Sequence, residues 1–324
     1  MRLKLGFVPL TDAAPLIVAQ ALGFFADEGL TVELSREVSW ATVRDKVAVG
    51  ALDGAHMLAP MALAANLGLG SEPAPLIAPM ALSHNGAAVT LASRLLPAEE
   101  PDAAGLARLV RRRKEQDASP LTFAVVFPYS IHNYLLRAWM AQAGIDPDLD
   151  VRLTVAPPPR MAELLAGGVI EGFCAGEPWS TAAATRGVGR LAVRAGELWG
   201  HAPDKVLGVT DGWAGEDPAR LQALVRALLR AAAWADSPAH RAELAHLLAE
   251  PQYVGVEAAV IEEGLRHIRF HADGANVPKL QDAAWLLEQM VLWGQAGAGL
   301  DIKAAAARVY RPDLFEAATT TPIR

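Results

Sequence analysis

The sequence contains very little cysteine: Cys174 is the single one among 324 residues. One cysteine excludes an intramolecular disulfide and any metal cluster that needs several thiolates. A lone cysteine can act as a nucleophile when a base lies beside it, but the surrounding stretch EGFCAGEPW offers no obvious one. We therefore interpret Cys174 as a small buried residue.

Common catalytic signatures are also absent. The chain has no GxxxxGK(S/T) phosphate loop, no GxSxG elbow, no HExxH zinc motif and no glycine fingerprint after its first predicted strand. The best metal candidate is HIRFH, which would place His267 and His271 on one helical face, with Glu262 or Glu263 as a third ligand. Structural packing is the simpler interpretation. We expect no enzymatic activity, no metal and no cofactor.

Basic residues are fewer than acidic ones. The formal net charge is -7, from 29 Lys and Arg against 36 Asp and Glu, whereas nucleic-acid-binding domains are usually basic. One basic stretch, RLVRRRKEQD at 108–117, is interpreted as a solvated helix end or loop. We therefore expect no direct nucleic-acid partner.

Hydrophobic runs long enough to cross a membrane are not seen. The stretch APLIAPMAL at 74–82 is too short to span a bilayer and contains a proline. At the start, MRLKLGFVPLTD has only a short apolar run that is broken at Pro9, unlike a secretory leader. We expect a cytoplasmic protein without membrane insertion, or a periplasmic one if the native chain has a leader that is missing here.

What the chain does contain is an alternation of strand-like and helix-like segments. Strands are predicted at 3–10, 31–37 and 54–60, with helices between them, and a second series begins with a strand at 121–128. This rhythm is typical of doubly wound parallel sheets. Ligand sites in such sheets lie where the carboxyl ends of strands lead into helices.

The length suits two domains rather than one. The chain leaves the first α/β series, builds the second, and then returns to a mainly helical region after about residue 200. We predict an α/β fold with two domains arranged as a clamshell. Lobe I comprises residues 1–88 and 196–324, including the helical C-terminal region, and lobe II comprises residues 89–195.

Three residues are candidates for anion recognition. Trp40 falls in the first turn of a helix predicted to start near Ser39, and His132 falls in the first turn of a helix capped by Ser130. Helix starts carry free backbone N–H groups that favour anions. Lys205 follows a turn and precedes an apolar run. Each residue also has an ordinary structural interpretation, but loops and helix starts would meet in the cleft of a clamshell.

Several blocks of sequence resemble one known family. The blocks LTDAAPLIVA, SWATVRDK and DGAHMLAP together are specific, and FPYSIHNYLLRAWMAQAGIDP, CAGEPW, HAPDKVLG and FHADGANVP extend the similarity from Leu3 to about Trp293. The chain is similar over this range to the nitrate- and bicarbonate-binding proteins of ABC transporters. The resemblance implies a type II periplasmic-binding-protein clamshell that holds a small planar oxyanion between its lobes.

The same resemblance suggests site residues. Trp40 matches the family's cleft tryptophan, His132 its helix-start histidine, and Lys205 the lysine that pairs with nitrate. The bicarbonate branch is expected to carry an acidic residue and a calcium ion there, so Lys205 favours nitrate or nitrite. Ala87 stands where the family often has glutamine, which removes a hydrogen bond worth about 0.5–1.5 kcal/mol.

Three functions follow from the resemblance. The absent leader favours a cytoplasmic nitrate/nitrite sensor that sequesters an antiterminator protein and releases it when the anion binds. The alternative is the solute-binding component of a nitrate-type ABC importer, whose partner would be the permease. A third possibility, from a different class, is an enzyme on the same fold, similar to a pyrimidine-precursor synthase.

Overall fold

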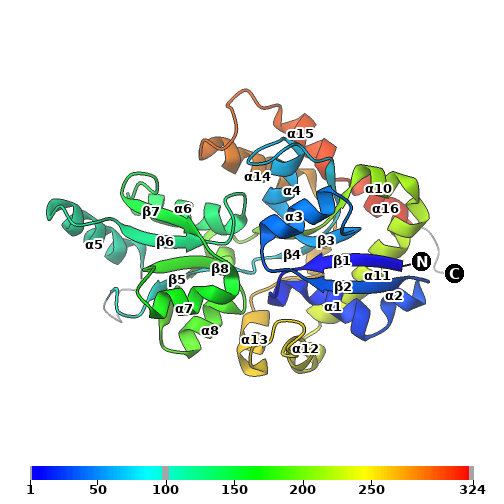
Figure 1. The fold of residues 1–324 in the computed structure, drawn as a ribbon, viewed down its shortest axis with the longest axis horizontal. Coiled ribbons are helices and arrows are strands. Elements are labelled where there is room, and N and C mark those ends of the chain that lie inside the picture. Colours follow the sequence, from blue (N-terminus) through cyan, green and yellow to red (C-terminus); the bar gives the residue numbers. More distant parts are fainter. Residues whose placement is uncertain (1, 97–101, 321–324) are drawn as a thin grey trace.

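The computed structural model describes residues 2–96 and 102–320 (Figure 1). A first sheet of five strands has the order β2-β1-β3-β10-β4. β1 runs parallel to β2 and β3, whereas β10 runs antiparallel to β3 and β4. The strands are β1 (Arg2–Phe7), β2 (Thr31–Arg36), β3 (Gly54–Leu58), β4 (Leu76–His84) and β10 (Pro203–Thr210).

A second five-stranded sheet has the order β7-β6-β8-β5-β9. Here β6 is parallel to β7 and β8, and β5 is antiparallel to β8 and β9. The strands are β5 (Ala87–Ala92), β6 (Leu121–Val125), β7 (Val151–Val155), β8 (Gly172–Gly176) and β9 (Gly189–Arg194). Both sheets are therefore mixed. The parallel βα units were predicted, whereas the antiparallel strands come from the connections between the sheets.

Helices cover both sheets. In Figure 1, α5 lies at the outer end of the second sheet, and α14 and α15 lie beside α4 over the first. On the other side of the first sheet, α1 packs against α11. The helices are α1 (Ala14–Ala21), α2 (Phe24–Asp27), α3 (Trp40–Ala48), α4 (Ala59–Asn66), α5 (Ala103–Glu115), α6 (Ile131–Gln142), α7 (Met161–Ala166), α8 (Trp179–Thr185), α9 (Ala195–Trp199), α10 (Asp211–Glu216), α11 (Pro218–Asp236), α12 (Arg241–Leu248), α13 (Ala258–Leu265), α14 (Leu280–Leu292), α15 (Ile302–Val309) and α16 (Pro312–Thr320).

The chain passes between the sheets twice, once from β4 to β5 and once from β9 through α9 to β10. Asn85 fastens the two connections together, because its N–H donates to Ala202 O at 3.0 Å and its Oδ1 accepts from Ala202 N at 2.8 Å. Its φ of 67° lies in the left-handed region, which asparagine tolerates well. We propose that the lobes meet at these connections, with the first boundary at Gly86 rather than 88.

Some predicted elements differ from the structure. HIRFH is not helical, because α13 ends at Leu265 and His271 only precedes a short 3-10 turn. The basic stretch is a solvated helix end, as predicted: it lies in the second half of α5, and Arg113 Nη2 donates to Ser119 O at 2.7 Å. Within residues 2–96 and 102–320, no helix has the length and apolar character that crossing a membrane requires.

Candidate functional site

Trp40 is the first residue of α3, as the sequence indicated. Ser39 caps this helix by accepting a hydrogen bond from Thr42 N at 3.2 Å, which fixes the helix start. The indole is only 1% exposed, and its Nε1–H has no hydrogen-bond partner among the described residues. The ring instead lies against His56 of β3, with 5.4 Å between ring centroids. A buried, unpaired N–H is costly, so this donor is available to a ligand.

His132 holds a matching position in the second sheet's helix α6. Ser130 caps that helix by accepting from Asn133 N at 3.1 Å, and its hydroxyl donates to Phe127 O at 2.6 Å. The imidazole is fully buried, and neither ring nitrogen has a hydrogen-bond partner in the part of the chain that the structure describes. Burial, together with the positive charge of Lys205, holds the pKa of His132 well below its usual range. The ring is therefore neutral at pH 7 and can donate one hydrogen bond.

Lys205 is not in a loop as predicted, but is the third residue of β10. Its side chain is fully buried, with Nζ 2.6 Å from Asp12 Oδ2 and 2.5 Å from Asp204 Oδ1. The same ammonium lies 5.7 Å from the centre of the Trp40 ring, within range of a cation–π interaction. Burial lowers the pKa of Lys205, but the two carboxylates raise it by more, so the lysine stays charged.

Asp12, His56 and Asp204 complete the cluster and were missed from the sequence. Asp12 lies in the 3-10 turn Thr11–Ala13 after β1, and its Oδ1 is 2.9 Å from His56 Nε2. The polar residues in LTDAAP and APDKVLG, each next to an apolar run, are the signal that could have pointed to the two carboxylates. The sequence could not predict that these two carboxylates lie together, because β1 and β10 are far apart in the sequence.

The charges in this cluster are balanced unevenly. Burial opposes ionisation of Asp12, but Lys205 and His56 hold the pKa of its carboxyl far below the usual range. For Asp204 burial prevails, and the negative charge of Asp12 adds to it, so its pKa rises to about 6 despite Lys205. Burial also lowers the pKa of His56. At pH 7 one lysine thus faces two carboxylates, and Asp204 is the group closest to taking up a proton.

Two glycines bring the second sheet against this cluster. A Cβ atom on Gly176, at the end of β8, would lie 3.4 Å from His132 Nε2 and 3.6 Å from Asp12 Oδ2. One on Gly86 would lie 3.1 Å from Asp204 Oδ2 and 3.4 Å from Asp12 Oδ2. The backbones approach the polar groups closely here because there is no side chain to keep them apart. Trp40 and Lys205 are thus brought together directly, and His132 reaches them across Gly176.

Hydrogen bonds between the two sheets' loops hold this arrangement closed. Thr11 N donates to Glu177 O at 2.9 Å, and Trp179 Nε1 donates to Pro9 O at 2.9 Å. Glu177 N in turn donates to Gly86 O at 3.0 Å. The cluster is therefore buried between segments of both sheets. Ala87 is buried in β5 opposite Gly176, where a longer side chain would lie beside the cluster.

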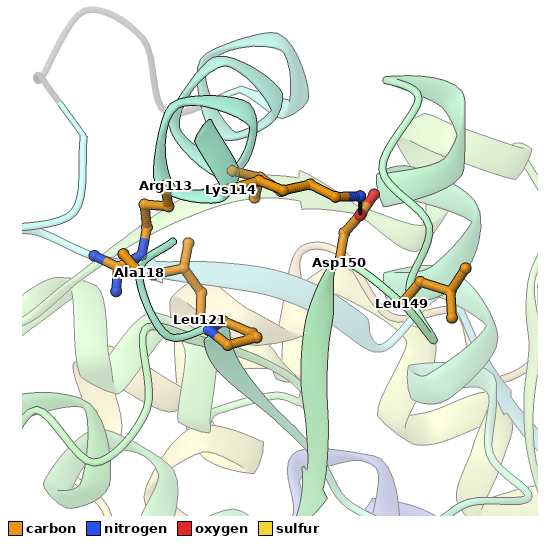
Figure 2. Close-up of a pocket in the computed structure, with 8 residues that line it drawn as sticks. Arg113, Lys114, Ala118, Leu121, Leu149 and Asp150 are labelled. Carbon is orange, nitrogen blue, oxygen red and sulfur yellow. Dashed lines mark hydrogen bonds and ion pairs between the residues drawn. The ribbon is translucent and has the colours of Figure 1, made fainter. Parts of the chain in front are cut away.

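Other polar features lie apart from this cluster. Figure 2 shows a shallow surface pocket between α5 and the start of β7, lined by Arg113, Lys114, Leu149 and Asp150 among others. Lys114 Nζ pairs with Asp150 Oδ1 across it at 2.7 Å, and the pocket shares no residue with the cluster. The candidate pair His267 and His271 does not share a helical face: His267 faces Glu263 at 3.8 Å, while His271 Nδ1 contacts Asn276 Oδ1.

The fold and the buried polar cluster between two lobes define the class: a protein with the periplasmic-binding-protein fold. The chain belongs to the NMT1-like family, whose model matches residues 1–249. In the crystal structure of the periplasmic nitrate-binding protein NrtA from Synechocystis PCC 6803, the fold is the same with a TM-score of 0.93 and 30% identity, covering 98% of this chain and 88% of that one. The predicted relation to nitrate- and bicarbonate-binding proteins is confirmed.

Two further relatives are larger proteins. The nitrate import ATP-binding protein NrtC of Synechocystis sp. (strain ATCC 27184 / PCC 6803 / Kazusa) is 38% identical over 333 residues, which cover 97% of this chain and 49% of NrtC. The bicarbonate transport ATP-binding protein CmpC of the same organism is 38% identical over 311 residues, which cover 91% of this chain and 46% of CmpC. The chain thus spans about half the length of these two curated relatives.

Proposed function

We propose that this chain binds a small planar oxyanion, nitrate or nitrite, as the solute-binding component of a nitrate-type ABC importer. The observation that carries the proposal is the set of buried donors at one place: the Trp40 Nε1–H and the His132 ring, both without partners among the described residues, beside the Lys205 ammonium. The relatives support it, since NrtA is described as nitrate-binding and covers nearly the same length.

The chemistry of nitrate suits these donors. Nitrate is planar, carries one negative charge and only accepts hydrogen bonds, so it needs several N–H groups aimed into one plane. Trp40 supplies one directional donor and neutral His132 another, and Lys205 supplies charge. In a buried site each of these interactions counts for more than in water. The first turns of α3 and α6 add the favourable electrostatics of helix N-termini.

The proposed mechanism is closure of the lobes around the anion. Trp40 and Lys205 belong to the first sheet and its helices, while His132 belongs to the second. An anion that contacts all three stabilises the closed arrangement, in which Thr11 and Trp179 make their hydrogen bonds between lobes. Closure then presents a different surface to the importer's other subunits.

The importer role is preferred to the cytoplasmic sensor predicted from the sequence. The relatives are described as components of nitrate or bicarbonate transport, and one of them as periplasmic. The comparisons give no support to a sensor, to an antiterminator partner or to a cytoplasmic location. The importer role is also preferred to the synthase-like enzyme, because NrtA is described as nitrate-binding and NrtC as a nitrate import protein.

Bicarbonate is the second candidate ligand, because the cluster has acceptors as well as donors. Asp204 Oδ2 is buried and has no hydrogen-bond partner among the described residues. Nitrate has no O–H to give it, whereas bicarbonate has one. Asp204 therefore either becomes protonated to accompany nitrate or stays ionised and accepts from bicarbonate. CmpC, a bicarbonate transport protein, is as similar to this chain as NrtC is.

Calorimetric titration of the dialysed protein with nitrate, nitrite, and bicarbonate with and without calcium tests these proposals. Saturable heat with nitrate or nitrite, weakened at least about tenfold by His132→Ala and by Trp40→Phe, is the expected result. The variant His246→Ala, at an exposed position on α12, serves as control. Saturation by bicarbonate alone would favour the second candidate, and no heat with any of the anions would overturn both.

A further inference from the structure

A second polar cluster lies at the connections between the lobes. His84 is the last residue of β4, and His201 lies just before β10, so the two histidines belong to the two segments that pass between the sheets. Asp282 comes from the first turn of α14, in the C-terminal region. Three segments distant in the sequence therefore contribute one metal-ligating side chain each. None of the three was singled out from the sequence.

The geometry of this cluster suits a metal ion. One ligand atom from each side chain lies within 4.8 Å of the other two. His201 Nε2 is 3.2 Å from Asp282 Oδ1, and His84 Nε2 is 3.8 Å from Asp282 Oδ2. Ligands at about 2.0–2.2 Å from a tetrahedral Zn²⁺ lie roughly 3.3–3.6 Å apart. The contacts to Asp282 lie on either side of this spacing but end on different carboxylate oxygens, so small side-chain rotations would bring the three ligand atoms around one ion.

The environment favours a cation over a simple hydrogen-bond network. His84 is 1% exposed, and its Nδ1 has no hydrogen-bond partner among the described residues. The rings of His84 and His201 are tilted by 31° with 4.4 Å between centroids, and both face the carboxylate of Asp282. His201 is 38% exposed on its side chain, so a water can enter as the fourth ligand. The ammonium of Lys279 acts against a cation here, since its charge is felt at His84.

We propose that His84, His201 and Asp282 bind a divalent transition-metal cation of the Zn²⁺ type. Two imidazoles, one carboxylate and an open position match the sites that hold this ion with three protein ligands. The bound ion would tie both connections to α14. Gly86 lies two residues after His84, and Asp204 lies three residues after His201, so the ion would stiffen the backbone that carries one side of the buried cluster.

Cobalt(II) titration of the chelator-treated protein tests the proposal directly. Co²⁺ in a four-coordinate site with nitrogen and oxygen ligands gives intense visible absorption bands, whereas those of six-coordinate Co²⁺ are weak. We expect these bands to saturate at about one equivalent and to be displaced by Zn²⁺. In His201→Asn and Asp282→Asn, the affinity should fall by more than about tenfold. His201 is partly exposed, so its variant keeps the fold; thermal unfolding checks both.

The variant His267→Asn is the matched control, because His267 faces Glu263 at 3.8 Å on the surface and could hold an adventitious ion. Binding that is unchanged in both cluster variants, or lost in the control, would overturn the proposal, as would absence of four-coordinate bands. The titration contains no oxyanion, so its outcome does not depend on the proposed nitrate site.

Discussion

Lys205 Nζ lies 2.6 Å from Asp12 Oδ2, and both side chains are completely buried. Because Asp204 also pairs with this ammonium, two carboxylates of the fold already balance the positive charge of the lysine. The residue that the sequence suggested as the positive charge for an anion is therefore also a structural counter-ion. Its substitution will affect stability and binding together, and the two effects have to be measured separately.

Lys205→Met should destabilise the fold strongly. The methionine keeps much of the volume but leaves Asp12 and Asp204 buried without a cation, and breaking a buried pair in this way costs about 3–5 kcal/mol. The free energy of unfolding from urea denaturation measures the loss. Lys114→Met, which breaks an exposed pair with Asp150, should cause no measurable change. Equal stability of the two variants would show that the buried triad contributes nothing.

Anion affinity should rise as the pH falls from about 7.5 to about 5.5. Asp204 has a pKa of about 6, and a bound anion favours its neutral form, which can donate a hydrogen bond. Lowering the pH through 6 supplies that proton, so binding strengthens, by at most about tenfold per pH unit for one linked proton. Nitrate itself does not titrate in this range.

Asp204→Asn isolates this effect. Asparagine is neutral at every pH and nearly the same size, so the pH dependence of nitrate binding should flatten. Asp148→Asn, in an exposed pair with Arg137, should leave it unchanged. Affinity that rises with pH in the unaltered protein would instead support an ionised Asp204 as the acceptor for bicarbonate.

Gly86→Ala should weaken anion binding without unfolding the protein. The new methyl group would lie 3.1 Å from Asp204 Oδ2 and 3.4 Å from Asp12 Oδ2, and so displaces the groups that line the site. We expect a loss of about tenfold or more in calorimetric titration. Gly212→Ala is the control, since a Cβ there meets nothing within 4 Å. An unaltered affinity in Gly86→Ala would place the anion elsewhere.

Trp179→Phe should shift the lobes toward the open arrangement. The indole Nε1 donates to Pro9 O from the opposite lobe, and losing that bond costs about 0.5–1.5 kcal/mol. Nitrate affinity should fall roughly 2- to 12-fold, with a larger radius of gyration in small-angle scattering. Trp213→Phe loses a comparable bond to Asp53 within the first lobe; if it weakens binding equally, closure is not the cause.

The local features of the site were accessible from the sequence. Trp40 and His132 were placed correctly in first turns because capping depends on neighbours: Ser39 and Ser130 accept bonds from residues only three positions further on. The order of parallel βα units followed from hydrophobic periodicity for the same reason. Their role in anion binding remains a prediction that the titrations above test.

Lys205 shows where this reasoning stops. The sequence predicted that Lys205 lies near a turn. It could not predict that the following strand, β10, inserts antiparallel between β3 and β4. That pairing is decided by the return of the chain from the second sheet. The predicted helical face for His267 and His271 failed similarly, because the helix ends at Leu265, two residues before His267.

The sequence by itself determined the family, through the resemblance of its blocks to known proteins. It also determined the two α/β series and the caps that place Trp40 and His132, because these depend on periodicity and contacts between near neighbours. Only the tertiary structure decided that Asp12, His56 and Asp204 share a buried cluster with Lys205, and that His84, His201 and Asp282 meet at the connections. Burial and Coulomb interactions between residues far apart in the chain set those charges, and no local pattern encodes such distances.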